Sequence, residues 1–255
     1  MKKIIAAALL SFSLNSFANN APLWLRFCSI SPDGQTIAFS YKGDLFSVPV
    51  NGGIAKQLTT NPAYDAYPIW SPDGQKIAFA STREGSMDIY LMNKNGGVPK
   101  RLTTNSGSEI PMAFTDNNHV LFSSAIMPTA KSIFFASGTF PQTYEVNIDA
   151  SRPRLYSPIT MCDANVKSNG DILYHDVKGY EDNFRKHHRS PVTRDIWLYS
   201  KGNYTKLTNF DGEDRTPVWG NNTNEYYYLS EEDGTFNVYK RNIDGSGKKQ
   251  LTFHK

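Results

Sequence analysis

The sequence lacks several features that assign a chain to a class directly. After the N-terminal segment it has no hydrophobic run near the roughly 20 residues that a membrane-spanning helix needs. Gly-x-Ser-x-Gly, His-Glu-x-x-His, a phosphate loop and a dinucleotide fingerprint are all absent. Residues 244–247, Asp-Gly-Ser-Gly, lack the first glycine of the serine-hydrolase motif and fall where other units carry Asn-Gly-Gly. We therefore interpret them as a hairpin turn, and no catalytic residue is identified.

The sequence also has few residues at metal-ligand spacing, and its net charge is small. His187 and His188 are adjacent, and neighbouring side chains of an extended strand point to opposite faces. No cysteine or carboxylate stands at a spacing that completes a zinc site, so we expect neither a metal nor another cofactor. The formal net charge is +3, and Lys2 and Lys3 lie in a segment that we expect to be removed. The remaining charge is close to zero and does not favour a nucleic-acid partner.

The N-terminus has the pattern of a secretory signal peptide. Two lysines precede the apolar run 4–10, and Ser16-Phe17-Ala18 is a small-x-small cleavage site. We expect cleavage after Ala18, no membrane span, and a mature protein that is periplasmic or secreted. The domain assignment is therefore a signal peptide over 1–18 and a folded domain over 19–255.

Only two cysteines remain after export, Cys28 and Cys162. An oxidising compartment permits a disulfide. The two residues fall in the first and fourth units of the repeat described next, which places them on well-separated sheets, whereas a disulfide needs Cα atoms about 4.4–6.8 Å apart. We expect two buried thiols.

A repeat is the most informative feature that is present. Ser31-Pro32-Asp33-Gly34-Gln35 recurs forty residues later as Ser71-Pro72-Asp73-Gly74-Gln75, each time before an apolar β-rich run. In the second unit, tight turns separate four short strands, with Gly74 and Asn95-Gly96-Gly97 accepting positive φ. The frame fits five times, and Leu-Thr pairs end most units. The units cover approximately 23–60, 64–104, 109–157, 160–208 and 214–252.

A four-stranded sheet of this size cannot bury both of its faces alone. Radial stacking of such sheets gives a β-propeller, and a period of about 40–45 residues is its sequence signature. A β-sandwich also has short, regularly spaced strands, but it does not repeat a sequence at this period. We therefore predict an all-β propeller with about five four-stranded antiparallel blades. The tryptophans before the turns, Trp70 and Trp219, are interpreted as packing between blades.

The sequence leaves closure of the ring open. Residues 251–255 stop where a further unit would begin, and an open propeller exposes edge strands. Either five blades close the ring, or the chain is the front part of a longer protein with a six- or seven-bladed ring, which we favour. Association of several copies also stays open.

Two insertions depart from the repeat. Residues 125–140 and 177–193 each join the second and third strands of their units, so both emerge on one face of adjacent blades. Long loops in compact domains are usually functional or disordered. We hypothesise a docking or gating surface; the alternative is that the insertions only pack onto the rim or cover another domain. The candidate binding residues are Met127, Phe140, Tyr180, His187, His188 and Arg189 on the insertions, with Tyr64, Asp65 and Tyr67 on a blade connection at the same face.

The repeat unit resembles the WD-repeat-like blade of TolB and of tricorn-type peptidases. Four segments carry this likeness: Trp70-Ser71-Pro72-Asp73-Gly74, Ile77-Ala78-Phe79, Asp88-Ile89-Tyr90 and Leu102-Thr103. The segments 40–44, 59–68, 174–176, 178–182 and 234–241, together with the two insertions, resemble the amino-terminal propeller of exported tricorn-like serine peptidases. This second resemblance covers essentially all of the mature chain.

The resemblance implies a non-catalytic domain of a peptidase. In that family a propeller precedes a PDZ module and a serine peptidase domain, which these 255 residues do not include, and it is thought to filter peptide substrate. We expect a peptide or protein ligand for this chain. The alternative is a TolB-like periplasmic scaffold that binds envelope proteins without any protease. A lyase or glycosidase propeller would need a pair of acid/base carboxylates, and no convincing pair is present.

Overall fold

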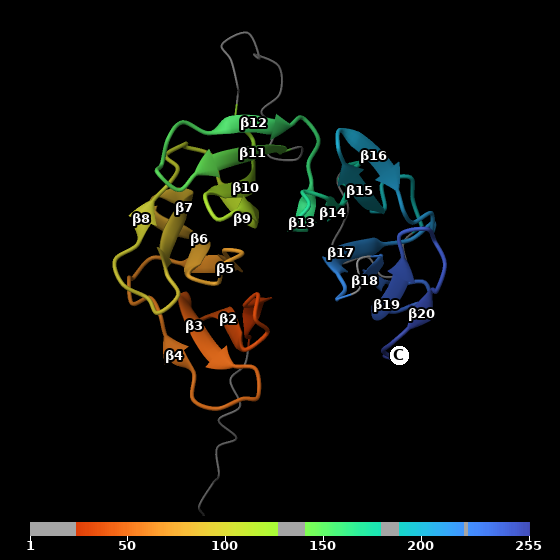
Figure 1. Cartoon of the computed structure of the whole chain (residues 1–255), viewed down its shortest axis with the longest axis horizontal. Coiled ribbons are helices and arrows are strands. Elements are labelled where there is room, and N and C mark those ends of the chain that lie inside the picture. The colour runs from red at the N-terminus through yellow and green to blue at the C-terminus, as the bar shows by residue number, and fades with distance from the viewer. Residues whose placement is uncertain (1–23, 127–140, 180–188, 222–223) are drawn as a thin grey trace, which may run out of the picture.

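The computed structural model describes residues 24–126, 141–179, 189–221 and 224–255. Within these residues the chain forms 20 β-strands and no helix. The strands make five four-stranded antiparallel sheets arranged around a common centre, with β5, β9, β13 and β17 innermost (Figure 1). The predicted all-β propeller with four-stranded blades is confirmed.

Each blade uses four consecutive strands in simple meander order. The strands of blades one to three are β1 Arg26–Ile30, β2 Thr36–Tyr41, β3 Asp44–Pro49, β4 Lys56–Gln57, β5 Asp65–Trp70, β6 Lys76–Glu84, β7 Ser86–Asn93, β8 Lys100–Arg101, β9 Glu109–Asp116, β10 His119–Ser124, β11 Gln142–Asn147 and β12 Arg154–Ser157. Those of blades four and five are β13 Cys162–Val166, β14 Ile172–His175, β15 Ile196–Ser200, β16 Asn203–Lys206, β17 Asp214–Trp219, β18 Glu225–Ser230, β19 Asn237–Asn242 and β20 Lys249–Gln250.

The repeated Ser-Pro-Asp-Gly turn closes the innermost hairpin in the same way in the first two blades. The Ser31 hydroxyl donates to the Asp33 carboxylate at 2.5 Å, and the Ser71 hydroxyl donates to Asp73 at 2.6 Å. Gly34 and Gly74 follow with φ of 71° and 65°, a region that favours glycine. The two turns therefore occupy matching places on neighbouring blades, as the repeat predicts.

In four of the five blades, the threonine of a Leu-Thr pair accepts a hydrogen bond from the backbone of the third strand. The hydroxyl oxygens of Thr59, Thr103, Thr208 and Thr252 each accept a backbone N–H at 2.9 Å, from Leu45, Ile89, Ile196 and Val238. The preceding leucines Leu58 and Leu102 are buried between blades. One dipeptide thus supplies a core side chain and an acceptor for a buried donor, which explains why it recurs.

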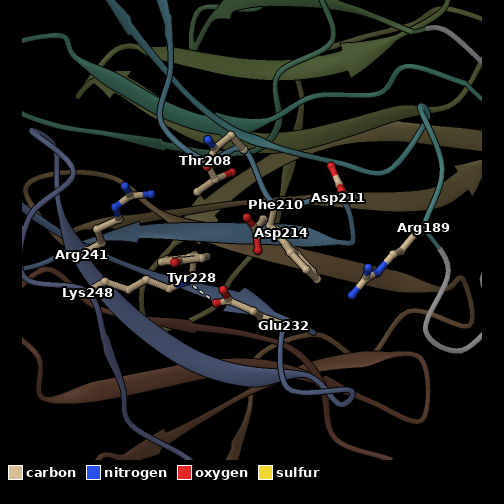
Figure 2. Close-up of a pocket in the computed structure, with 10 residues that line it drawn as sticks. Arg189, Thr208, Phe210, Asp211, Asp214, Tyr228, Glu232, Arg241 and Lys248 are labelled. Atoms are coloured by element: carbon tan, nitrogen blue, oxygen red, sulfur yellow. Dashed lines mark hydrogen bonds and ion pairs between the residues drawn. The ribbon is translucent and has the colours of Figure 1, made fainter.

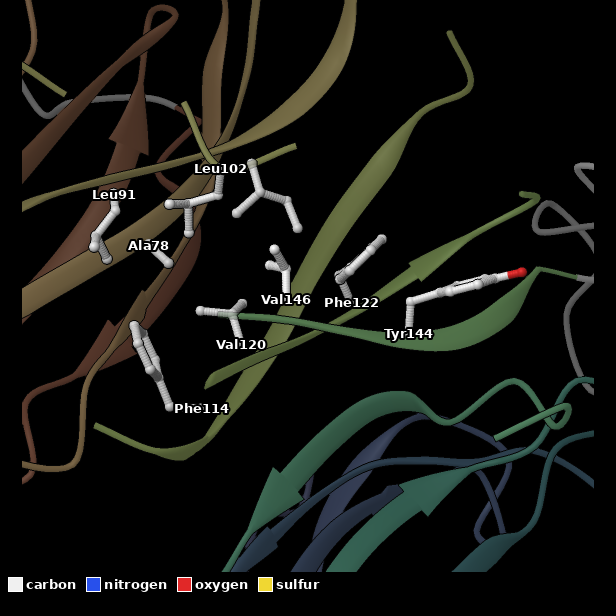
Figure 3. Close-up of a cluster of buried hydrophobic side chains, with 9 residues drawn as sticks. Ala78, Leu91, Leu102, Phe114, Val120, Phe122, Tyr144 and Val146 are labelled. Atoms are coloured by element: carbon white, nitrogen blue, oxygen red, sulfur yellow. The ribbon is translucent and has the colours of Figure 1, made fainter. Parts of the chain in front are cut away.

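Among the described residues, the core consists of four hydrophobic clusters, each between two successive blades. Figure 3 shows the second, where Ala78, Leu91 and Leu102 of one blade meet Phe114 and four further side chains of the next. The tryptophans follow the predicted packing. Trp70 Nε1 donates to the Ser29 carbonyl at 3.1 Å, and Trp219 Nε1 donates to the Asn165 carbonyl at 2.9 Å, each reaching the inner strand of the preceding blade.

Among the described residues, no corresponding cluster joins the fifth blade to the first. Trp70 packs against the first blade, whereas Ile30, at the matching position of that blade, is 59% exposed. Ile69 packs against the third blade, whereas Val218, its counterpart in the fifth blade, is 46% exposed. The first and fifth blades therefore each retain one uncovered face.

The structure corrects the sequence-based expectation for the cysteines. The prediction of two buried thiols is wrong for Cys28, which is exposed, while Cys162 is partly buried; both are free thiols. Cys28 lies on β1, in the blade whose outer face no other described blade covers. In the second blade, Gly85 alone separates the second and third strands, because β6 continues to Glu84 and β7 begins at Ser86. In the part of the chain that is described, no helix is long and apolar enough to cross a membrane.

Candidate functional site: the central channel

Four of the five inner strands carry one non-glycine residue in the left-handed backbone region. These residues are Phe27, Tyr67, Asp163 and Thr216, with φ of 53°, 55°, 49° and 54°. At each of these positions the register of the inner hairpin shifts. Each strand therefore contains a β-bulge, which re-aims a side chain.

The third blade differs for a physical reason. Pro111 occupies the position that matches Tyr67, and the proline ring holds φ near −65°. The strand β9 instead pairs Pro111 with Phe122 and Ala113 with Leu121, so the unpaired residue is Met112. The bulge is retained in this blade and moves by one residue.

The four bulged residues of the inner strands form two contacting pairs, Phe27 with Tyr67 and Asp163 with Thr216, and we call these four residues the channel ring. The rings of Phe27 and Tyr67 lie 3.9 Å apart between centroids. On the fourth and fifth blades, the Thr216 hydroxyl donates to the Asp163 carboxylate at 2.9 Å. Burial raises the pKa of Tyr67, and the nearby Tyr64 and Asp163 raise it further. Tyr67 stands on the second blade and Asp163 on the fourth.

His175 lies behind the channel ring and is 7% exposed. Its Nδ1 accepts the backbone N–H of Thr216 at 3.3 Å and lies 3.6 Å from the Asp163 carboxylate. Burial lowers the pKa of His175 to about 4, so the imidazole is neutral near pH 7. The arrangement does not activate a nucleophile, because the Thr216 hydroxyl donates to the carboxylate and not to the imidazole.

A cavity of about 400 Å³ lies next to the channel ring. Its walls come from the first four blades and include Ile69, Trp70, Met112 and Asn165. Ile69 and Asn165 stand two residues beyond Tyr67 and Asp163 on their strands, so the cavity continues the channel toward the Ser-Pro-Asp-Gly turns. The walls combine apolar side chains with a few polar groups, which is typical of a ligand site.

A second hollow of about 330 Å³ lies where the fourth blade connects to the fifth (Figure 2). Arg189, Asp214 and Arg241 line it, together with the ion pair between Lys248 and Glu232. Burial raises the pKa of Asp214 to about 6. Arg241 donates to the backbone carbonyls of Leu207 and Gly245 at 3.0 Å. This hollow therefore carries charges of both signs.

The predicted site residues separate into three groups. Tyr67 belongs to the channel ring, and Arg189 lines the hollow of Figure 2. Tyr64 is 38% exposed, whereas Asp65 is fully buried and pairs with Arg83 at 2.8 Å, which gives its carboxylate a partner inside the protein. Met127, Phe140, Tyr180, His187 and His188 lie outside the described residues, so their roles stay predictions.

Reasoning from the sequence missed Phe27, Asp163, Thr216 and His175. A signal was present for the bulges, because Pro68, Pro111 and Pro217 interrupt three inner strands, and proline within a sheet is confined to edges and bulges. No comparable signal marks Asp163 or His175, since their proximity to Thr216 depends on the packing of the fourth blade against the fifth.

Comparison with known proteins places this geometry in a family. The chain is 35% identical over 71 residues to Tricorn protease homolog 1 of Streptomyces coelicolor, an overlap of 28% of this chain and 6% of that protein. It is 32% identical over 58 residues to the Protein TolB homolog of Chlorobium luteolum, an overlap of 23% of this chain and 13% of that protein. The chain thus spans only a small part of these relatives.

Solved structures share the fold. The crystal structure of the tricorn protease superposes with a TM-score of 0.72 at 21% identity, covering 90% of this chain and 22% of that one. A TolB structure from Agrobacterium tumefaciens gives a TM-score of 0.69 at 16% identity, covering 90% of this chain and 80% of that one. The family model "Tricorn protease N-terminal beta propeller domain" matches residues 22–255. The chain therefore belongs to the family of tricorn protease N-terminal β-propeller domains.

Proposed function

We propose that this chain is the substrate-handling propeller of an exported tricorn-like serine peptidase, and that it binds unfolded peptide in its central channel. Family membership and the relative named Tricorn protease homolog 1 support the peptidase context. Hydrolysis belongs, in this proposal, to domains outside these 255 residues.

The channel ring is the observation that carries the proposal. A left-handed backbone costs an L-residue roughly 1–2 kcal/mol, and glycine would avoid that cost. The chain instead places aromatic, acidic and hydroxyl side chains at these positions on four inner strands. Strained positions that carry side chains cluster at binding sites, and these lie beside a cavity of about 400 Å³.

Binding of an unfolded polypeptide tests the proposal directly. Fluorescence anisotropy of a labelled, reduced and carboxymethylated casein fragment should rise with the concentration of this chain. Replacing both Phe27 and Tyr67 by alanine should weaken binding about ten-fold, because buried aromatic contacts are strong anchors. The control is Phe253→Ala, which removes an aromatic ring that is 75% exposed and lies outside the channel. Absence of binding by the unaltered chain would exclude the proposal.

Export is a separate part of the proposal. The signal-like segment 1–18 supports it, and the TolB relatives are consistent with a periplasmic protein. N-terminal sequencing of the protein recovered from the periplasm or medium should begin at Asn19. An N-terminus that retains the lysines of that segment would contradict cleavage.

We also propose that the insertion 177–193, at the rim of the propeller, is a docking surface for the same ligand. Arg189 lines the hollow of Figure 2, at the edge of an insertion that carries Tyr180, His187 and His188. Deletion of 180–189 should reduce binding of a protein partner or peptide. Unchanged binding would favour the alternative, in which the insertion only packs on the rim.

A TolB-like scaffold without protease activity is the second candidate. The likeness to the Agrobacterium tumefaciens TolB structure, of which the alignment covers 80%, favours it. Immunoblotting of the native protein separates the two: the peptidase proposal expects a polypeptide much larger than these 255 residues, and the scaffold proposal does not require one.

A further inference from the structure

The carboxylate of Asp163 is the only acidic group of the channel ring, and its side chain is 52% exposed. The Thr216 hydroxyl bonds to it without bringing charge. His175 lies 3.6 Å away, but its Nδ1 already accepts the Thr216 N–H and therefore has no proton to give to the carboxylate. The negative charge of Asp163 is not neutralised by either hydrogen-bonding neighbour.

Three arginines near this site each contact another group. Arg26, which acts as a charge on Tyr67, lies 5.1 Å from the centroid of the Trp24 ring. Arg194 lies 3.5 Å from the Glu213 carboxylate, and the guanidinium of Arg215 lies 4.0 Å from the centroid of the Phe236 ring. Burial lowers the pKa of Arg215, and Asp163 opposes this effect less than Glu213 does. Within the described part of the chain, no lysine or arginine nitrogen lies within 4.0 Å of the Asp163 carboxylate.

The other pair of the channel ring is aromatic. The Phe27 and Tyr67 rings stand on the inner strands of the first and second blades, whereas Asp163 stands on the inner strand of the fourth. Aromatic faces attract cations, and a carboxylate that is partly shielded from water attracts them more strongly than an exposed one. A site that combines an unneutralised carboxylate with two aromatic rings fits a positively charged side chain.

We propose that the channel ring binds a lysine or arginine side chain of an extended peptide, with Asp163 as the counter-ion and Phe27 and Tyr67 as the aromatic wall. This inference rests on the proposed function, since it names the side chain that the channel selects. It assigns a role to Asp163, Thr216 and Phe27.

Two labelled peptides test it. Both are unstructured and identical except at the central residue, which is lysine in one and norleucine, an uncharged analogue of similar length, in the other. Anisotropy at low ionic strength should show about ten-fold tighter binding of the lysine peptide. The preference should shrink as salt is added, because exposed charges are screened.

Matched variants identify the residue responsible. Asp163→Asn keeps an acceptor for the Thr216 hydroxyl and should abolish the preference for lysine. Asp149→Asn, at an exposed turn of the third blade, should leave the preference intact. Tyr67→Phe should retain the preference and Tyr67→Leu should reduce it. Thermal unfolding of each variant confirms that the blades are folded.

The outcomes separate this inference from the function on which it rests. Equal binding of both peptides, unaffected by Asp163→Asn, would overturn the lysine site and leave peptide binding intact. Binding of neither peptide would overturn both. A lysine preference that survives Asp163→Asn would also overturn the assignment of the counter-ion.

Discussion

Some polar side chains of this protein satisfy buried backbone groups. Thr103 is 1% exposed, and its hydroxyl accepts the Ile89 N–H at 2.9 Å inside the sheet. Thr103→Val preserves the shape of the side chain but leaves that donor without a partner. We expect it to lower the free energy of unfolding by about 1–3 kcal/mol.

Urea unfolding measures the stability of both Thr103→Val and a control variant at the next residue. Thr104 is exposed, so Thr104→Val should change the stability by no more than about 0.5 kcal/mol. Similar midpoints for the two variants would show that the repeated threonines are not structural acceptors.

The buried carboxyl of Glu109 should make the free energy of unfolding decrease as the pH rises. It is fully buried, and burial is the main cause that raises its pKa from 4.5 to about 7; Thr103 opposes this rise and Asp88 adds to it. Below about pH 4.5 the carboxyl is protonated in both states. Between about pH 4.5 and 7 the unfolded state releases the proton first, so the folded protein loses stability as the pH rises, by about 3 kcal/mol.

Glu109→Gln should remove this part of the pH dependence, because glutamine does not titrate. Unfolding free energies measured from pH 4 to pH 8 should then be flatter than those of the unaltered chain. Glu84→Gln, at an exposed carboxyl, should not flatten the curve. An unchanged slope in Glu109→Gln would show that this carboxyl is not strongly perturbed.

At the scale of a strand, each bulge in an inner strand places one side chain in the channel ring and holds its backbone in the strained left-handed region. Thr216 is a β-branched residue at a φ of 54°. Thr216→Gly relieves the backbone and loses a partly exposed hydroxyl bond. We expect the stability to hold or to rise by up to about 1 kcal/mol, while preference for the lysine peptide weakens.

The matched substitution is Thr205→Gly on β16, an exposed position of an outer strand where the backbone is not left-handed. It should cost about 0.5–1 kcal/mol, because glycine gains more freedom on unfolding. Thermal unfolding of both variants tests whether the left-handed backbone at Thr216 destabilises the protein. Equal losses at the two positions would mean that the bulge stores no strain.

At the scale of the whole molecule, the described residues leave one face of the first blade and one face of the fifth blade uncovered. Leu251 is 38% exposed, whereas its counterparts Leu58 and Leu102 are 7% and 3% exposed. Val218 on the same face is 46% exposed. We expect the purified chain to self-associate through this face, since contiguous apolar patches promote association.

Sedimentation velocity of Val218→Lys combined with Leu251→Lys should show more monomer at equal concentration. Val98→Lys, at a turn residue that is 97% exposed, should leave association unchanged. Equal association of all three proteins would show that another surface is responsible.

The sequence by itself determined the repeat and therefore the fold. Each blade is specified locally: Ser71 and Asp73 bond within the turn, Gly74 accepts its positive φ, and Thr103 bonds to a strand fourteen residues away. Interactions of such short range leave a periodic pattern in the sequence. The order of strands within a blade and the packing of Trp70 could be predicted for that reason.

Only the tertiary structure decided the channel. Tyr67 was predicted on a blade connection, but it lies within β5 and meets Phe27 forty residues earlier in the chain. The Asp163 carboxylate accepts the hydroxyl of Thr216, which lies on the adjacent blade. The exposure of Cys28 depends on a face of the first blade that no described blade covers. These features arise from how the blades pack around a common axis, and the period of a repeat does not encode which of its positions face the channel.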